Sequence, residues 1–88
     1  MIHKIFSVYD SKVEAYLQPF FMQTRGAAVR AITELVADSK HQFGKYPMDY
    51  TLFELGSYDD SNSKFDLHLT PHSLGLLQEF KMSPDVCV

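Results

Sequence analysis

The sequence has one cysteine, no long apolar run and no recognised catalytic motif. Its cysteine, Cys87, cannot form an intramolecular disulfide or a cysteine-based metal site, so a reducing compartment is expected. No apolar run approaches the ~20 residues that span a bilayer. The first residues, Met1 to Phe6, also lack the apolar core and cleavage site of a signal peptide. We therefore expect a soluble protein of the cytoplasm that contacts no membrane.

Motifs for nucleotide, ester or zinc chemistry are missing. The sequence contains no GxxxxGK[ST], GxGxxG, GxSxG or HExxH pattern. His68 and His72 lie four residues apart, but Pro71 between them argues against the helix in which that spacing forms a metal site. Asp59 and Asp60 suit a turn better than a calcium loop, because the glycine and the terminal glutamate of that loop are absent. We expect no enzyme activity, no metal and no cofactor.

The chain does contain enough apolar residues for one core. Hydrophobic residues make up 45% and charged residues 22% of the 88 residues, with seven phenylalanines and five tyrosines. Disordered segments lack such a composition. A chain of this length buries roughly 64% of its unfolded surface on folding. We predict one domain over residues 1–82, followed by a frayed tail over residues 83–88.

The net charge of −3 argues against a nucleic-acid-binding domain, because such domains are usually basic. The charge is, however, unevenly divided along the chain. Residues 1–45 contain six basic and four acidic side chains, or +2, whereas residues 46–88 contain two basic and seven acidic ones, or −5. An anionic partner should therefore meet the N-terminal part, and a basic partner should meet the acidic segment 49–66.

The spacing of apolar residues predicts an α+β fold. An antiparallel sheet of three or four strands should carry one long helix on a face and a short C-terminal helix. Alternation predicts the strands at residues 2–9, 19–23, 50–56 and 64–69. The short strand 19–23 should return beside the first strand. Residues 12–18 are expected to form a loop or a helical turn, and residues 57–63 the turn of a hairpin. The order of the strands in the sheet stays open.

The longest helix is predicted from about Arg25 to Asp38, with Thr24 as its N-cap. Its apolar face consists of Ala28, Ile32, Leu35 and Val36. Gly44 and Pro47 should block any extension. Near the end of the chain, Pro71 is expected to end the last strand. Ser73 should then cap the short helix, whose apolar face consists of Leu74, Leu77 and Phe80.

Aromatic residues close to basic ones give the main functional indication. Single-stranded nucleic acid is bound by basic grooves that follow the phosphates, together with aromatic faces on which bases stack. The candidates are Lys4, Lys12, Tyr16, Arg25, Arg30, Lys40, Lys45 and Tyr46. The core, by contrast, is expected to take Phe20, Phe21, Phe53 and Phe65.

In this hypothesis, Arg25 and Arg30 contact phosphates beside the free N–H groups at the start of the long helix. Tyr16 and Tyr46 stack on bases. Pairing of the arginines with acidic neighbours would remove this support. The alternative is a protein-interaction module that uses the acidic segment 49–66 to bind a basic partner.

Several segments resemble the small non-structural protein of gokushovirus-type microviruses, which are bacteriophages with circular single-stranded DNA. The resemblance is carried by Ile5-Phe6-Ser7-Val8-Tyr9-Asp10-Ser11-Lys12, Pro19-Phe20-Phe21 and Gly26-Ala27-Ala28-Val29-Arg30. It continues through residues 49–56, 58–60 and 70–75, and so covers nearly the whole chain. It implies a DNA-binding protein that acts in the change from duplex genome replication to single-stranded progeny synthesis.

No functional residues are implied by this resemblance, so the candidate residues rest on their chemistry alone. The expected partners are single-stranded DNA and a second copy of the chain, since a homodimer would double the phosphate contacts. In the alternative, segment 49–66 recruits or modulates a phage replication initiator, a procapsid component or a host factor. The expected location is the host cytoplasm.

Overall fold

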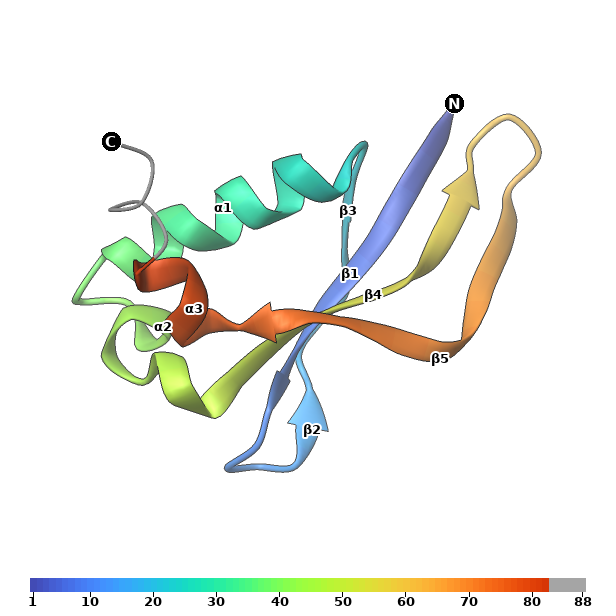
Figure 1. Ribbon diagram of the computed structural model, residues 1–88. Helices are drawn as coiled ribbons and strands as arrows, with labels where there is room; N and C mark the ends of the chain where they lie inside the picture. The colour runs from blue at the N-terminus through green and yellow to red at the C-terminus, as the bar shows by residue number, and fades with distance from the viewer. Residues whose placement is uncertain (83–88) are drawn as a thin grey trace.

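A curled antiparallel sheet carries one long helix across a face in the computed structural model, which describes residues 1–82 (Figure 1). The strands are β1 (Ile2–Asp10), β2 (Ala15–Tyr16), β3 (Phe20–Met22), β4 (Tyr50–Asp59) and β5 (Lys64–Leu76). The helices are α1 (Arg25–Ala37), α2 (Gln42–Lys45) and α3 (Leu77–Met82), with a 3-10 turn η1 (Pro47–Asp49). The predicted α+β class is confirmed, with five strands in the sheet. The expected tail, residues 83–88, lies outside the described residues.

The sheet has the order β2-β1-β4-β5, and β3 also pairs with β1. β1 is the central strand, because it pairs with β4 along its whole length and with both short strands on its other side. β2 pairs with Tyr9 and Asp10, near the end of β1. β2 itself lies within residues 12–18, which were expected to form a loop or a helical turn. Every pairing is antiparallel. β2 and β5 therefore form the two opposite edges of the sheet.

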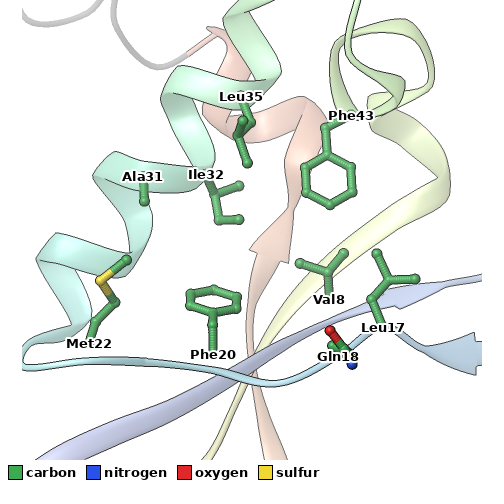
Figure 2. Close-up of a pocket in the computed structure, with 9 residues that line it drawn as sticks. All are labelled: Val8, Leu17, Gln18, Phe20, Met22, Ala31, Ile32, Leu35 and Phe43. Carbon is green, nitrogen blue, oxygen red and sulfur yellow. The ribbon is translucent and has the colours of Figure 1, made fainter.

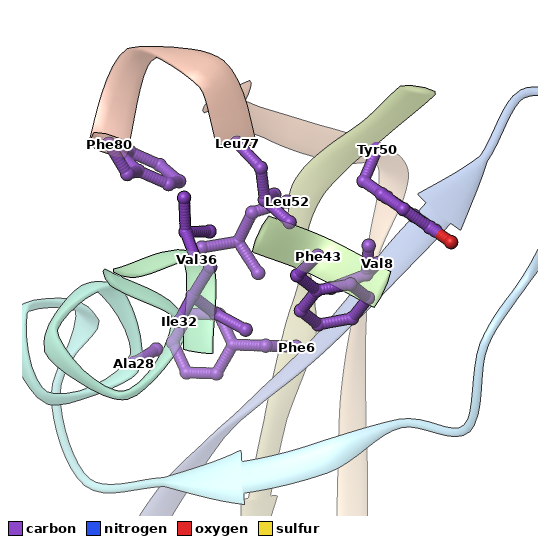
Figure 3. Packing of buried hydrophobic residues seen from close by; sticks show 10 residues of the cluster. All are labelled: Phe6, Val8, Ala28, Ile32, Val36, Phe43, Tyr50, Leu52, Leu77 and Phe80. Atoms are coloured by element: carbon purple, nitrogen blue, oxygen red, sulfur yellow. The ribbon is translucent and has the colours of Figure 1, made fainter. Parts of the chain in front are cut away.

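Alternation along β1 directs its side chains to two different surroundings. The core lies on one face of the sheet, beneath α1 and α3 (Figure 3). It consists of Phe6, Val8, Ala28, Ile32, Val36, Phe43, Tyr50, Leu52, Leu77 and Phe80. Leu35, which was expected on the buried face of α1, is 37% exposed. The opposite face of the sheet carries Tyr9 and Phe53, and we call it the outer face.

The boundaries of α1 follow from its caps. Thr24 has an extended backbone, and its Oγ1 accepts a hydrogen bond from the Ala27 N–H at 3.0 Å, as predicted for an N-cap. Beyond α1, the short helix α2 forms where only a stop signal was predicted. A side chain at Gly44 would overlap the backbone carbonyl of Asp38, so the absence of a Cβ atom permits this close turn.

β5 continues to Leu76, so the prediction that Pro71 ends the strand is wrong. The ladder between β4 and β5 shifts register here, because residues 68–71 lie opposite Leu55 alone. A proline is tolerated in such a bulge of an edge strand, where its missing N–H breaks no ladder bond. Ser73 pairs with Phe53 and is not a helix cap, and α3 begins only at Leu77.

Two phenylalanines that were assigned to the core lie at the surface. Phe21 is 46% exposed and Phe65 is 60% exposed, so this assignment is wrong for both. Phe20 and Phe53 are half-buried. The difference arises because α1 and α3 cover only one face of the sheet, whereas Phe21 and Phe65 contact Tyr58 on the outer face.

Candidate nucleic-acid interface

The eight candidate residues do not form one continuous groove. Lys4 and Arg25 lie near the start of β1 and of α1, while Arg30 and Lys40 are exposed on α1 and on the turn that follows it. The remaining four lie at the other end of β1: Lys12, Tyr16, Lys45 and Tyr46. The fold therefore divides the candidates into separate sets.

Arg25 takes part in an ion pair that joins the first turn of α1 to β4. Its Nε donates a hydrogen bond to Oε1 of Glu54 at 2.8 Å, and Nε2 of His68 lies 2.7 Å from Oε2 of the same carboxylate. Glu54 is 2% exposed, whereas the Arg25 side chain is 55% exposed. The ring of His68 stacks on that of His72, with 4.2 Å between the centroids.

The surroundings of Glu54 keep its carboxylate charged. Burial by itself raises the pKa of Glu54, but hydrogen bonds from Arg25 and His68 and the positive charges of Arg25 and Lys4 outweigh burial and lower the pKa to about 2. The same hydrogen bond and charge raise the pKa of Arg25. Arg25 therefore neutralises a buried charge of the fold, which weakens its assignment to phosphate. Arg30 has no ion pair within residues 1–82.

At the other end of β1, three aromatic rings form a cluster on the outer face. Tyr16 of β2 meets Tyr9 of β1 edge-to-face, with 4.9 Å between the ring centroids, and meets Phe53 of β4 at 5.5 Å. Tyr16 remains 48% exposed, while its two neighbours are half-buried. The contacts with Tyr9 and Phe53 hold the Tyr16 ring in place and leave part of it open to a ligand.

A pair of hydrogen bonds brings two basic segments to this end of the molecule. The N–H and the hydroxyl of Ser11 both donate to the carbonyl oxygen of Asp49, each at 3.0 Å. These bonds hold the turn that contains Lys12 against η1. Lys45 and Tyr46 come directly before η1 in the sequence, so both basic segments lie at this end. A shallow groove of about 410 Å³ is lined here by Lys45, Tyr46, Pro47, Met48, Asp49 and Gln78.

The acidic segment 49–66 is largely compensated within the chain. Glu54 is buried against Arg25, and Asp60 binds the Met1 amino group at 2.7 Å and His3 at 2.9 Å. These hydrogen bonds lower the pKa of Asp60, and hydrogen bonds from Ser61 lower that of Asp59. The segment therefore offers much less free negative charge to a basic partner than its composition indicates.

Sequence reasoning missed a second aromatic row on the outer face. The rings of Phe21 and Tyr58 are 5.8 Å apart, and those of Tyr58 and Phe65 are 4.7 Å apart, with His3 paired opposite Tyr58. Strand alternation together with the register of the hairpin could have placed Tyr58 and Phe65 side by side. The pairing of β3 with β1, which was predicted for residues 19–23, adds Phe21 to this row.

A separate hollow of about 380 Å³ lies between α1 and the segment that leads into β3 (Figure 2). It is lined by Val8, Leu17, Gln18, Phe20, Met22, Ala31, Ile32, Leu35 and Phe43. Gln18 is the one polar side chain in this lining, and no cation faces the hollow. Because phosphates need positive charge, the hollow does not extend the candidate interface.

The curled sheet, with helices on one face and aromatic side chains on the other, defines a small α+β protein with a candidate surface for single strands. A family model described as "Phage ORF5 protein" matches residues 3–80, and the chain belongs to this family of bacteriophage proteins. Comparisons with curated proteins and with solved structures give no match. Within residues 1–82, no helix has the length and apolar character needed to cross a membrane.

Proposed function

We propose that this phage protein binds single-stranded DNA without strong sequence preference. In this role it would act in the host cytoplasm, in the switch from duplex genome replication to single-stranded progeny synthesis. One observation carries the proposal: the half-exposed ring of Tyr16 is held edge-to-face by Tyr9 and Phe53, next to the turn of Lys12. Stacking of one base on an aromatic side chain contributes roughly 1–3 kcal/mol and tolerates any base.

The charge of this end supports a single strand as the ligand. Lys12, in the turn beside Tyr16, and Lys45, in α2, supply positive charge for phosphates at this end of the molecule. Tyr46 is a second exposed ring, at 58% exposure. The overall charge of −3 disfavours the coating of a duplex, which relies on many phosphate contacts. The resemblance to microviral proteins points to the same ligand. A homodimer would present two such surfaces to one strand.

The alternative function, a protein-interaction module that uses segment 49–66, has less support. Glu54 and Asp60 are engaged by groups of the same chain, which leaves Asp49 and Asp66 as its exposed or half-exposed charges without an ion pair within residues 1–82. Recovery of a phage or host protein from infected cells that resists nuclease and needs Asp66 would favour this alternative.

Titration of a fluorescent oligonucleotide of about 20 nucleotides tests the proposal. Affinity should fall as salt rises, and Lys12→Ala should reduce the slope of log K against log salt by roughly 0.7. Tyr16→Ala should weaken binding at every salt concentration and leave that slope unchanged. The matched control is Leu69→Ser, because Leu69 is fully exposed on β5, away from this end. Absence of binding at low salt, or equal losses in Tyr16→Ala and Leu69→Ser, would contradict DNA binding through this surface.

A further inference from the structure

β5 is an edge strand whose first part is regular and has neither a proline nor a bulge. Within residues 1–82, the order β2-β1-β4-β5 leaves one side of its backbone without a neighbouring strand. Residues 64–67 continue an unbroken ladder with residues 56–59 of β4. Natural edge strands are protected by proline, bulges or charged side chains. The first part of β5 carries one charge of each sign, Lys64 and Asp66, so a strand with the complementary charges can still pair with it. Pro71 and the bulge protect the second part of β5, but they lie beyond residue 67.

Two apolar side chains of this first part, Phe65 and Leu67, extend an aromatic row that crosses the sheet. On the outer face, His3, Tyr58 and Phe65 occupy one row of paired positions in β1, β4 and β5. The row ends at Phe65, which is 60% exposed, next to Leu67, which is 62% exposed. Such exposed apolar groups at an open sheet edge favour burial by another strand.

The charges of β5 are complementary to those of a second β5 in one particular register. In a two-fold antiparallel pair centred on Phe65, the two Phe65 rings face each other, and each Lys64 lies opposite Asp66 of the second copy. A pair centred on Asp66 would place two carboxylates opposite each other, which is unfavourable. A pair centred on Leu67 would place Phe65 opposite Leu69 of the second copy. Leu69 lies in the bulge, where the ladder is interrupted, so this register is also unfavourable.

We propose that a second copy of this chain docks on β5, by antiparallel pairing about a two-fold axis at Phe65. The two sheets then join into one, with an aromatic row that runs from Tyr58 and Phe65 of one copy into those of the other. Two ion pairs between Lys64 and Asp66 select the register. This inference goes beyond DNA binding and does not depend on it, because Tyr16 lies in β2, at the opposite edge of the sheet.

Light scattering or sedimentation without DNA tests the dimer. The mass should rise with concentration toward twice 10.1 kDa. Lys64→Asp and Asp66→Lys should each raise the dissociation constant about tenfold, because each places like charges opposite one another. The double variant restores opposite charges and should recover the affinity of the unchanged chain. Glu34→Lys, a charge reversal at an exposed position of α1, is the control and should have no effect. A monomer at all concentrations, or a double variant no tighter than the single ones, would overturn the proposal.

Cysteine crosslinking tests the register in a Cys87→Ser background. Directly opposite residues of an antiparallel pair have Cα atoms roughly 4.5–5.5 Å apart, within the range of a disulfide. Phe65→Cys should therefore form a disulfide-linked dimer on mild oxidation, faster than Leu67→Cys. The reverse order would overturn the register about Phe65. Because these measurements contain no DNA, their failure and a failure of DNA binding are separate results.

Discussion

Arg25 and Glu54 lie 29 residues apart in the sequence, and their Nε and Oε1 atoms lie 2.8 Å apart in the fold. The contact joins the first turn of α1 to the middle of β4, across the inner face of the sheet. Arg25 binds the carboxylate through its Nε atom and so holds the start of the helix in place, while half of the arginine side chain stays exposed. Glu54 thereby remains ionised in a place where an unpaired carboxylate would be strongly unfavourable.

Removal of Arg25 should destabilise the protein. Arg25→Ala leaves the buried carboxylate of Glu54 with His68 as its remaining side-chain partner, so the free energy of unfolding should fall. The control is Arg30→Ala on the same helix, which should change the free energy by less than about 0.5 kcal/mol because Arg30 is exposed. Urea unfolding followed by circular dichroism measures both. Equal stability of the two variants would show that the Arg25 pair contributes nothing.

The same carboxylate predicts how stability depends on pH. The pKa of Glu54 is about 2 in the folded protein, below its ordinary value of 4.5. Its contribution is therefore complete above pH 4.5 and is lost as the pH falls toward 2. The loss should reach roughly 3–4 kcal/mol at most, since the two pKa values differ by about 2.5 and each unit corresponds to ~1.4 kcal/mol.

A Glu54→Gln variant isolates this contribution, because Asp59 and Asp60 also titrate with lowered pKa values. The difference in unfolding free energy between the unchanged protein and Glu54→Gln should shrink between pH 5 and pH 2.5. Unfolding curves at several pH values in this window measure it. If this difference in unfolding free energy stayed constant with pH, the folded state would not lower the pKa of Glu54.

Two glycines should respond to alanine in opposite directions. At Gly44, a Cβ atom would overlap the backbone oxygen of Asp38 and lie 2.8 Å from its carbonyl carbon, so Gly44→Ala should cost roughly 1–3 kcal/mol. At Gly26, in the first turn of α1, the nearest atom is Thr24 Oγ1 at 4.0 Å. Gly26→Ala should therefore stabilise the helix by up to about 1 kcal/mol. Thermal melting of both variants measures the effect, and a destabilised Gly26→Ala would contradict this account.

The junction between β5 and α3 can be tested with two leucines. Leu77, the first residue of α3, is completely buried, so Leu77→Ala should cost about 2–5 kcal/mol. Leu69, in the bulge of β5, is fully exposed, and Leu69→Ala should change stability by less than about 0.5 kcal/mol. Chemical denaturation gives both values. Similar losses in the two variants would place Leu69 in the core and contradict the bulge.

Sequence patterns correctly predicted the strands and the helix that bury one face in the core. β1, β4 and α1 each place apolar side chains at regular spacing toward the core, and Thr24 caps α1 as its residue type indicates. The strand through Pro71 was missed, because the rule that proline ends a strand holds for paired positions and not for a bulge at an edge.

The pattern also could not locate the partners of Glu54. Alternation along residues 50–56 predicts that Glu54 shares a face with Leu52. Arg25 and His68, however, reach Glu54 from elements that are distant in the sequence. Similarly, the exposure of Phe65 depends on the strand order, which composition and periodicity do not determine. Local spacing therefore indicates which face a residue occupies, whereas the sheet topology decides what lies beside it.

The edge of β1 opposite β4 is covered by two short strands, with Pro19 between them. Together these strands have only five residues, so they offer too little continuous backbone for another chain to extend the sheet. Fibril growth requires two open edges on each molecule, and the described part of this one has a single long edge, β5. A concentrated solution should therefore stay clear, without amyloid or gel, even though Phe65 and Leu67 are exposed.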